Sequence, residues 1–225
     1  MCASQNPSAQ IPFALPVRTS MGEEDFLITP SNHLAVSQLN TGNHLLLLGL
    51  KGTGKSHLAR IWQERRSAIP FNIATTNIGN LSNDAIVWED ADLTQWDAKT
   101  QATAFHLLNT VKEKQIALLV TATTPPTQWS LTLADLRSRL LALPVSQIEM
   151  PDDTLVAGLL LKHFKDRQLR VSEEVLNYII TRIPRDGFVI EQTVKQLDEL
   201  SLANNRAITV PLVSKLFEKA PPQHD

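Results

Sequence analysis

The segment Gly49–Ser56 carries the strongest chemical pattern of the sequence and reads GLKGTGKS. It matches the G-x-x-x-x-G-K-[ST] motif, in which glycines let backbone N–H groups close around a phosphate at the start of a helix. The lysine of such a motif bridges β- and γ-phosphate oxygens, and the next hydroxyl is offered to Mg²⁺. We therefore expect a nucleotide to be bound by Gly49, Gly52, Thr53, Gly54, Lys55 and Ser56.

Two carboxylates form the second candidate group. The apolar segment Ala85–Trp88 is typical of a buried strand and is followed directly by Glu89 and Asp90. Beside a phosphate-binding loop, such acids hold the metal ion and orient water. We expect Glu89 to bind Mg²⁺ together with Ser56, and Asp90 to act catalytically. Glu89 stands where aspartate is usual, so we expect its extra methylene to shift the Mg²⁺ ion or to make Glu89 bind the ion through a water molecule. The alternative interpretation is a strand that simply ends in two solvated acids.

Three further residues are candidates for contacts with phosphate charge. Thr123 follows the apolar run Ile116–Thr121, and ligands bind at the carboxyl ends of parallel strands; a plain turn residue is the alternative. Arg139 is the candidate to reach the nucleotide of a neighbouring subunit, where an arginine stabilises transition-state charge. Its alternative is a surface ion pair with Asp135 or another acid. Arg185 precedes a long helical segment and could reach the phosphates, or could be a solvated loop residue.

Composition argues against several other functions. The six histidines show no pair at helical metal-ligand spacing, no G-x-S-x-G elbow is present, and Cys2 is the only cysteine. Lys and Arg number 21 against 23 Asp and Glu, whereas duplex DNA binding usually requires a basic excess. The longest strongly apolar run, Leu45–Leu48, is too short to span a membrane. We expect a cytoplasmic protein without membrane or direct DNA contacts.

The expected secondary structure alternates and then becomes purely helical. Strand candidates are His44–Gly49, Pro70–Ala74, Ala85–Trp88, Ile116–Thr121 and Gln147–Met150. Helical stretches between them, of which 56–67 follows the glycine motif and 98–114 is the longest, predict an α/β fold with a parallel sheet. Beyond Pro151, segments 153–167, 172–182, 189–204 and 210–218 predict a small all-α domain. The expected organisation is a tail over 1–21, an α/β nucleotide-binding domain over 22–150, a helical domain over 151–219 and a tail over 220–225.

Two shorter features precede the glycine motif. An amphipathic helix is expected after an N-cap at Ser31, with Leu34 and Leu39 facing inward. Residues 10–17, QIPFALPV, combine large apolar side chains with two prolines and predict an extended apolar peptide.

These motifs together resemble those of the AAA+ proteins related to the replication initiator DnaA, and among them the Hda regulators. Residues 25–32, DFLITPSN, are similar to the family box that packs beside adenine, and 135–140, DLRSRL, are similar to its arginine-finger segment. The resemblance implies an AAA+ fold, in which a P-loop parallel five-stranded sheet flanked by helices is followed by a small all-α lid. It adds Phe26, Leu27, Ile28 and His57 to the nucleotide-binding residues and makes Thr123 the sensor 1 residue. Phe188 stands near the sensor 2 arginine position, which leaves Arg185 as a shifted candidate.

The resemblance extends to residues 10–15, which are similar to the peptide by which Hda regulators dock on the sliding clamp. Gln10 would supply amide hydrogen bonds, Ile11, Phe13 and Leu15 would enter apolar pockets, and Pro12 would lower the ordering cost. A disordered tail is the alternative. The implied partners are DnaA and the β subunit of DNA polymerase III, which is the sliding clamp, with DNA contacted only through the clamp.

The resemblance also implies a mechanism. A regulator carrying ADP or ATP with Mg²⁺ sits on the DNA-loaded clamp and offers Arg139 to ATP on DnaA, which accelerates hydrolysis and negatively regulates replication initiation. Its own ATPase activity would be weak at most, and a homo-oligomer is compatible with this scheme. The alternatives are a DnaA-like DNA-remodelling or helicase-loading ATPase, favoured by salt-dependent DNA affinity without the clamp, and a small-molecule P-loop kinase, favoured by product formation.

Overall fold

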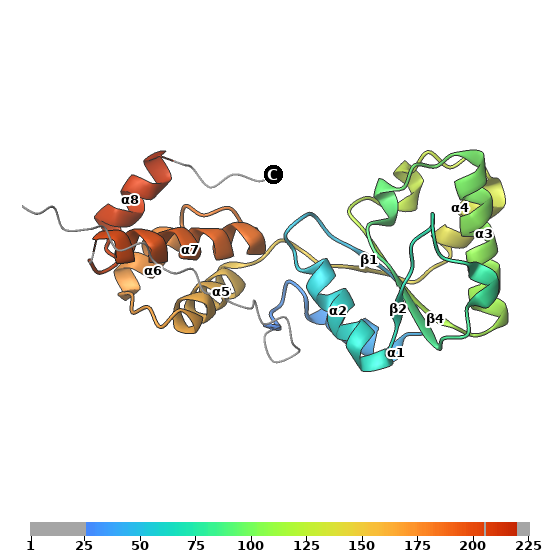
Figure 1. The fold of residues 1–225 in the computed structure, drawn as a ribbon, viewed down its shortest axis with the longest axis horizontal. Coiled ribbons are helices and arrows are strands. Elements are labelled where there is room, and N and C mark those ends of the chain that lie inside the picture. The colour runs from blue at the N-terminus through green and yellow to red at the C-terminus, as the bar shows by residue number, and fades with distance from the viewer. Residues whose placement is uncertain (1–25, 205, 220–225) are drawn as a thin grey trace, which may run out of the picture.

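A single parallel sheet forms the centre of the larger part of the molecule. The computed structural model describes residues 26–204 and 206–219 (Figure 1). The sheet has five strands in the order β2-β3-β4-β1-β5, all paired in parallel. Leu46 in β1 lies opposite Val120 in β4 and Val145 in β5. The strand bounds are His44–Leu48 (β1), Ile69–Pro70 (β2), Ala85–Trp88 (β3), Ala117–Ala122 (β4) and Val145–Gln147 (β5).

Helices cover both faces of the sheet, which explains why its central strands are almost entirely apolar. Alternate residues of β1 point to opposite faces: Leu46 joins one buried cluster, whereas Leu45 and Leu47 join the other. The first cluster contains side chains of α3 (Ala98–Glu113) and α4 (Ala134–Leu141). The second contains side chains of α1 (His33–Thr41) and α2 (Lys55–Arg66). The α/β layer is therefore closed on both sides.

The four lid helices α5–α8 pack around a core of their own. They span Asp153–Asp166 (α5), Glu173–Ile180 (α6), Gly187–Asn204 (α7) and Val210–Lys219 (α8). Leu160, Phe164, Ile179 and Val194 are buried in their shared cluster. Figure 1 shows these helices grouped to one side of the sheet and joined to it by the segment that follows β5. No helix among residues 26–204 and 206–219 is long and apolar enough to cross a bilayer.

The predicted fold class is confirmed, and β3 occupies the predicted residues. The strand predicted over 70–74 is wrong, because β2 ends at Pro70 and the chain then turns: Asn72 Oδ1 accepts from Ala74 N at 2.9 Å, and Asn72 O accepts from Thr76 N at 2.9 Å. The prediction for 147–150 is also displaced. β5 is an edge strand paired only with β1, and beyond it Glu149 N donates instead to Ser31 O at 3.0 Å.

The first helix, α1, differs from its prediction in the N-cap residue and in one of the two residues that face inward. Asn32, not Ser31, stands at the N-cap position of α1. Leu39 is buried as predicted, whereas Leu34 is 56% exposed and Ala35 is buried in its place. Residues 35 and 39 are four positions apart and share one face of the helix, whereas residues 34 and 39 do not, which explains why Ala35 and not Leu34 is buried.

Candidate nucleotide-binding site

The loop between β1 and α2 has the geometry of a phosphate cradle. Gly52 and Gly54 adopt φ of 80° and 98°, a region that strongly favours glycine. Lys55 begins α2, is 7% exposed, and donates from Nζ to Gly49 O at 2.8 Å and to Leu50 O at 3.1 Å. Burial lowers the pKa of the Lys55 ammonium, and the carboxylates of Asp90 and Asp92 oppose that shift. A phosphate would give this buried cation anionic partners in place of carbonyls.

The lid touches the loop at Gly52. A Cβ on this glycine would lie 2.2 Å from Asp186 Cγ, and Gly187 N donates to Gly52 O at 3.1 Å. Asp186 is 3% exposed and its Oδ1 accepts from Phe188 N at 2.8 Å, so its carboxylate also satisfies the first turn of α7. The motif glycine is thus required by the lid as well as by the loop.

A cleft of about 990 Å³ opens between this loop and the lid. One wall comes from Phe26, whose ring meets that of His57 edge to face at 5.2 Å between centroids. Leu27 beside it lies against α5 at Gly158, where an added Cβ would come within 2.7 Å of Leu27 Cδ1. Asn32 Nδ2 donates to Leu27 O at 2.8 Å and fixes this segment. The wall is apolar and aromatic, which suits a nucleobase.

Two carboxylates that follow β3 and two threonines that follow β4 form another wall. Asp90 has φ of 49°, and its N–H donates to Thr121 Oγ1 at 2.9 Å. Asp92 Oδ2 accepts from Thr123 N at 2.9 Å and Thr124 N at 3.1 Å. Asp90, Asp92, Thr123 and Thr124 all line the cleft. Asp92 was not singled out from the sequence, because only its bonds to the next strand bring it there.

The structure does not support the expected metal position of Glu89. Its side chain is exposed and absent from the cleft lining, because the left-handed turn at Asp90 redirects the chain there. Ser56, Asp90 and Asp92 line the cleft instead and offer the oxygen ligands that Mg²⁺ prefers. Within the described ranges, no group of three or more His, Cys, Asp or Glu could hold a metal ion. Phosphate oxygens and water would therefore have to complete the coordination of Mg²⁺.

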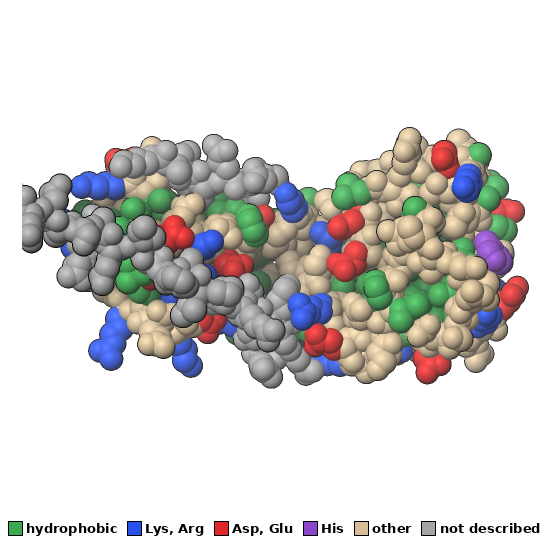
Figure 2. All heavy atoms as spheres, in the orientation of Figure 1, with side chains coloured by type: hydrophobic (Ala, Val, Ile, Leu, Met, Phe, Trp, Pro, Cys, Tyr) green, Lys and Arg blue, Asp and Glu red, His purple; other side chains and the backbone are tan. Residues whose placement is uncertain are grey.

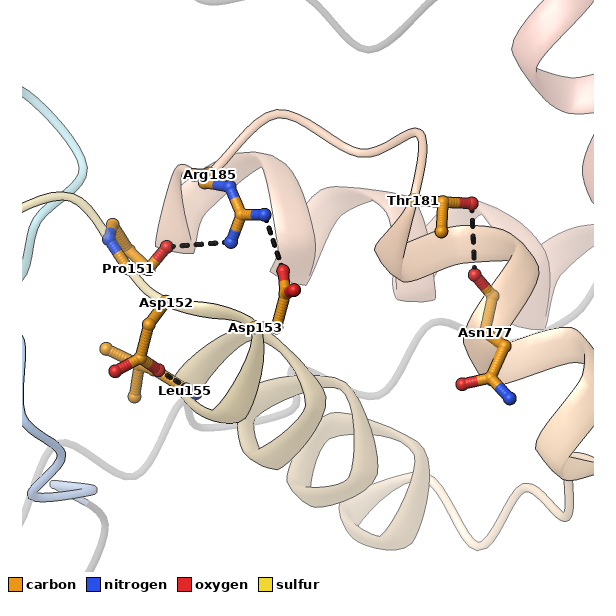
Figure 3. A network of polar contacts seen from close by, with 7 residues as sticks. All are labelled: Pro151, Asp152, Asp153, Leu155, Asn177, Thr181 and Arg185. Atoms are coloured by element: carbon orange, nitrogen blue, oxygen red, sulfur yellow. Dashed lines mark hydrogen bonds and ion pairs between the residues drawn. The ribbon is translucent and has the colours of Figure 1, made fainter.

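Arg185 is held away from the cleft. Figure 3 shows its guanidinium reaching back to the start of α5, where it donates to Pro151 O at 3.0 Å and pairs with Asp153 Oδ1. It does not line the cleft, which corrects the expectation that it reaches the phosphates. Phe188 in the first turn of α7 lines the cleft instead and is 60% exposed. The lid thus presents an aromatic ring near the position at which the family resemblance implies an arginine.

Arg139 also lies outside the cleft, on the last turn of α4. Its Cζ is 4.9 Å from the centroid of the Phe105 ring, and the residue is partly exposed. Among the described residues it forms no salt bridge, so the alternative of a pair with Asp135 is not what the structure contains. Arg137, two positions earlier, is exposed.

The structure brings most of the expected nucleotide-binding residues together. The cleft is lined by Phe26, Leu27, Gly52, Thr53, Gly54, Lys55, Ser56, His57, Asp90 and Thr123. Gly49 is not part of the cleft lining, but its carbonyl oxygen accepts a hydrogen bond from Lys55 Nζ. Ile28 is 61% exposed and lies instead at a separate cavity of about 110 Å³ between α1 and α2. Residues 10–15 lie outside the described part of the chain.

Sequence reasoning missed the contribution of the lid to the cleft. Leu155, Leu159, Lys162, His163 and Glu191 line it from α5 and α7. Burial lowers the pKa of His163, an effect that Glu191 opposes. Helical spacing alone could have indicated that 155 and 159 share a face, but not which surface that face meets.

A parallel sheet with a P loop and a helical lid over that loop defines an AAA+ module. Domain III of DnaA from Thermotoga maritima has the same fold, with a TM-score of 0.74 and 16% identity over 91% of this chain and 98% of that one. AMPPCP-bound DnaA from Aquifex aeolicus gives 0.69 and 19%, covering 87% and 69%. The RuvB Holliday junction branch migration motor of T. maritima gives 0.68 and 15%, covering 89% and 72%.

Two sequence comparisons narrow the class. The family described as "Hda, lid domain" matches residues 152–217. An uncharacterized protein of Haemophilus influenzae is 30% identical over 183 residues, which are 75% of this chain and 79% of the relative. The chain belongs to the Hda-like, DnaA-related AAA+ proteins.

Proposed function

We propose that the protein is a nucleotide-binding regulator of replication initiation, which stimulates hydrolysis of ATP bound to DnaA by supplying Arg139. The proposal is supported by family membership and by one observation above all: Arg139 is partly exposed, lies outside the chain's own nucleotide cleft, and is held over Phe105 without a salt bridge among the described residues. An arginine so placed is available to another protein's nucleotide.

The chain's own nucleotide has a different role in this proposal. ADP or ATP would occupy the cleft with its phosphates at Gly52–Ser56 and its base against Phe26, and Mg²⁺ would neutralise phosphate charge beside Ser56, Asp90 and Asp92. AMPPCP in the A. aeolicus relative supports nucleotide binding by this fold. The Gly52 contacts with Asp186 and Gly187 then let the bound nucleotide support the orientation of the lid. Intrinsic hydrolysis is not required for this function.

Docking on the DNA-loaded sliding clamp through Gln10–Leu15 completes the proposal, and DnaA and the clamp are its two partners. DNA would be contacted through the clamp. Figure 2 supports this choice over the DNA-remodelling alternative, since Lys and Arg side chains on the face drawn there alternate with Asp and Glu and form no continuous basic surface among the described residues. The net charge of −2 agrees.

The experiment that tests the proposal measures single-turnover hydrolysis of ATP on DnaA, with DNA-loaded clamp and the full chain present. Arginine fingers contribute about 10³–10⁵ in rate elsewhere, so Arg139→Ala should remove the stimulation while ADP binding and the thermal unfolding midpoint stay unchanged.

Arg137→Ala is the matched control, because it removes an exposed arginine from the same helix two positions away. It should keep most of the stimulation. Full stimulation by the Arg139 variant, or an equal loss with both variants, would contradict the assignment of Arg139.

A further inference from the structure

The start of α4, the helix that carries Arg139, is tied to a buried side chain of α3. Gln101 is 3% exposed, and its Oε1 accepts from Thr132 N and Leu133 N at 2.8 Å each and from Thr132 Oγ1 at 3.2 Å. Leu133 stands at the N-cap position of α4, where its apolar side chain cannot accept a hydrogen bond. Gln101 therefore anchors the chain, from a neighbouring helix, at the point where α4 begins.

The Gln101 amide is held in one orientation. Its Nε2 donates to Trp96 O at 3.0 Å, in the segment just before α3, while its Oε1 serves the segment just before α4. The two segments also meet through their aromatic rings, because Trp96 stacks on Trp129 at 5.5 Å with an interplanar angle of 15°. The place of Gln101 is thus set by contacts on both sides of the amide.

The last turn of α4 meets α3 as well. Arg139 Cζ lies 4.9 Å from the centroid of the Phe105 ring. Phe105 follows Gln101 by four positions, so both lie on one face of α3. Phe105 also packs against the buried cluster that contains Leu136 and Leu140 of α4. Since α4 has only 8 residues, a shift at its start would carry over to Arg139.

We propose that Gln101 is a positioning residue for Arg139 and sets the place of the guanidinium through α4. The inference rests on the proposed function, in which Arg139 acts on a nucleotide held by DnaA. Stabilisation of transition-state charge depends on placement, and a remote substitution that displaces a group by about 1 Å can cost about 10²-fold in rate. Gln101 does not line the chain's own cleft, so its effect falls on Arg139 and not on ADP binding.

The first test needs only the full chain. The ring current of Phe105 shifts the Arg139 Nε–H resonance, which Arg139→Lys assigns by removing it. Methionine is similar in length and volume to glutamine, but Gln101→Met removes the hydrogen bonds to both segments. In this variant, the Arg139 resonance should move towards the value of an exposed arginine.

The second test measures single-turnover hydrolysis of ATP on DnaA at increasing concentrations of the chain, with DNA-loaded clamp present. Gln101→Met should lower the maximal stimulated rate at least about tenfold. The half-saturating concentration should change by less than about twofold, because the displaced group acts in the transition state. The affinity of the variant for ADP should equal that of the wild type.

Lys114→Met is the matched control. Lys114 follows α3 at its other end, and its Nζ donates to Leu81 O at 2.7 Å. The same replacement thus removes a bond from a side chain to the backbone that does not involve α4. It should leave the Arg139 resonance and the stimulated rate unchanged. Unfolding midpoints of both variants separate positioning from a general loss of stability.

An unchanged Arg139 resonance in Gln101→Met would overturn the inference. So would a full maximal rate with Gln101→Met when Arg139→Ala has lost the stimulation, or equal losses with Gln101→Met and Lys114→Met. If the wild-type chain did not stimulate hydrolysis, the proposed function would fail, and the Arg139 resonance would still decide whether Gln101 positions Arg139.

Discussion

Gly52 is constrained in two ways, by its own backbone conformation and by a contact with the lid. Its φ of 80° belongs to the phosphate loop, and the space over its Cα is filled by the Asp186 carboxylate. The sequence motif predicts the first constraint, because phosphate cradles need glycine there. The second is a tertiary contact across more than a hundred residues, which no local pattern reports. The sequence motif therefore predicts glycine at position 52 for one reason, and the structure provides a second reason.

Gly52→Ala should weaken ADP binding at least tenfold and lower the free energy of unfolding by about 2 kcal/mol or more. A left-handed backbone costs alanine roughly 1–2 kcal/mol, and the new methyl group must also displace the buried Asp186 carboxylate. Isothermal titration with ADP and urea unfolding measure the two effects.

Gly79→Ala is the control for this change. Gly79 has no positive φ, and an added Cβ would meet only Asn77 Oδ1 at 3.4 Å. Stability should change by less than about 0.5 kcal/mol and ADP affinity should be retained. If Gly52→Ala behaved like this control, the lid contact would not constrain the loop.

At the scale of elements, the start of α7 is positioned by contacts within the lid and with the segment just before α5. Arg185 ties the preceding turn to the start of α5 through Pro151 O and Asp153 (Figure 3), and Asp186 caps α7. The Arg185–Asp153 pair is substantially exposed, at 41% and 71%, so it contributes little by itself. The bond to the Pro151 carbonyl adds direction. Arg185 therefore has a positioning role between two lid helices.

Arg185→Ala should lower the free energy of unfolding by about 0.5–1.5 kcal/mol and leave the ratio of ATP to ADP affinity unchanged. Nucleotide titrations and chemical unfolding provide the comparison. Arg182→Ala is a suitable reference, since Arg182 is an exposed neighbour whose guanidinium stacks on Tyr178 at 3.9 Å within the lid. A selective tenfold loss of ATP affinity in the Arg185 variant alone would contradict this positioning role and would support a contact between Arg185 and the phosphates.

The elements predicted well are those whose burial is complete. β3 is buried at every position, and its apolar run ends at the residues where the strand ends. β2 and β5 were misplaced because each lies at an edge of the sheet, where pairing partners and local turns decide the bounds. The same distinction applies to the site. Loop residues 52–56 were predicted from local chemistry, whereas Asp92 and the lid residues reach the cleft through packing.

At the scale of the whole molecule, the sheet with its flanking helices and the lid have separate hydrophobic cores with no residue in common, and the nucleotide cleft lies between them. The sheet and its helices bury one set of residues, and α5–α8 bury another. Each part therefore has its own apolar stabilisation. Tail residues 1–17 are outside the described part, so their contribution has to be measured by function.

Deletion of residues 1–17 should abolish binding to the sliding clamp while the unfolding midpoint and ADP affinity stay as in the full chain. Surface plasmon resonance on immobilised clamp measures the binding. Gln10→Ala should weaken it by removing the amide of the proposed docking peptide, and Gln5→Ala provides a matched glutamine in the same tail. Undiminished clamp binding after the deletion would remove residues 10–15 from that role.

The hydrogen bond from Gly187 N to Gly52 O attaches the four packed lid helices, α5–α8, directly to the phosphate loop. Binding or release of a diphosphate at this loop would therefore act on all four helices together. A protein that binds only the lid helices would then respond to the contents of the loop without contacting the nucleotide. By thermodynamic reciprocity, such binding would also change the affinity of the loop for the nucleotide.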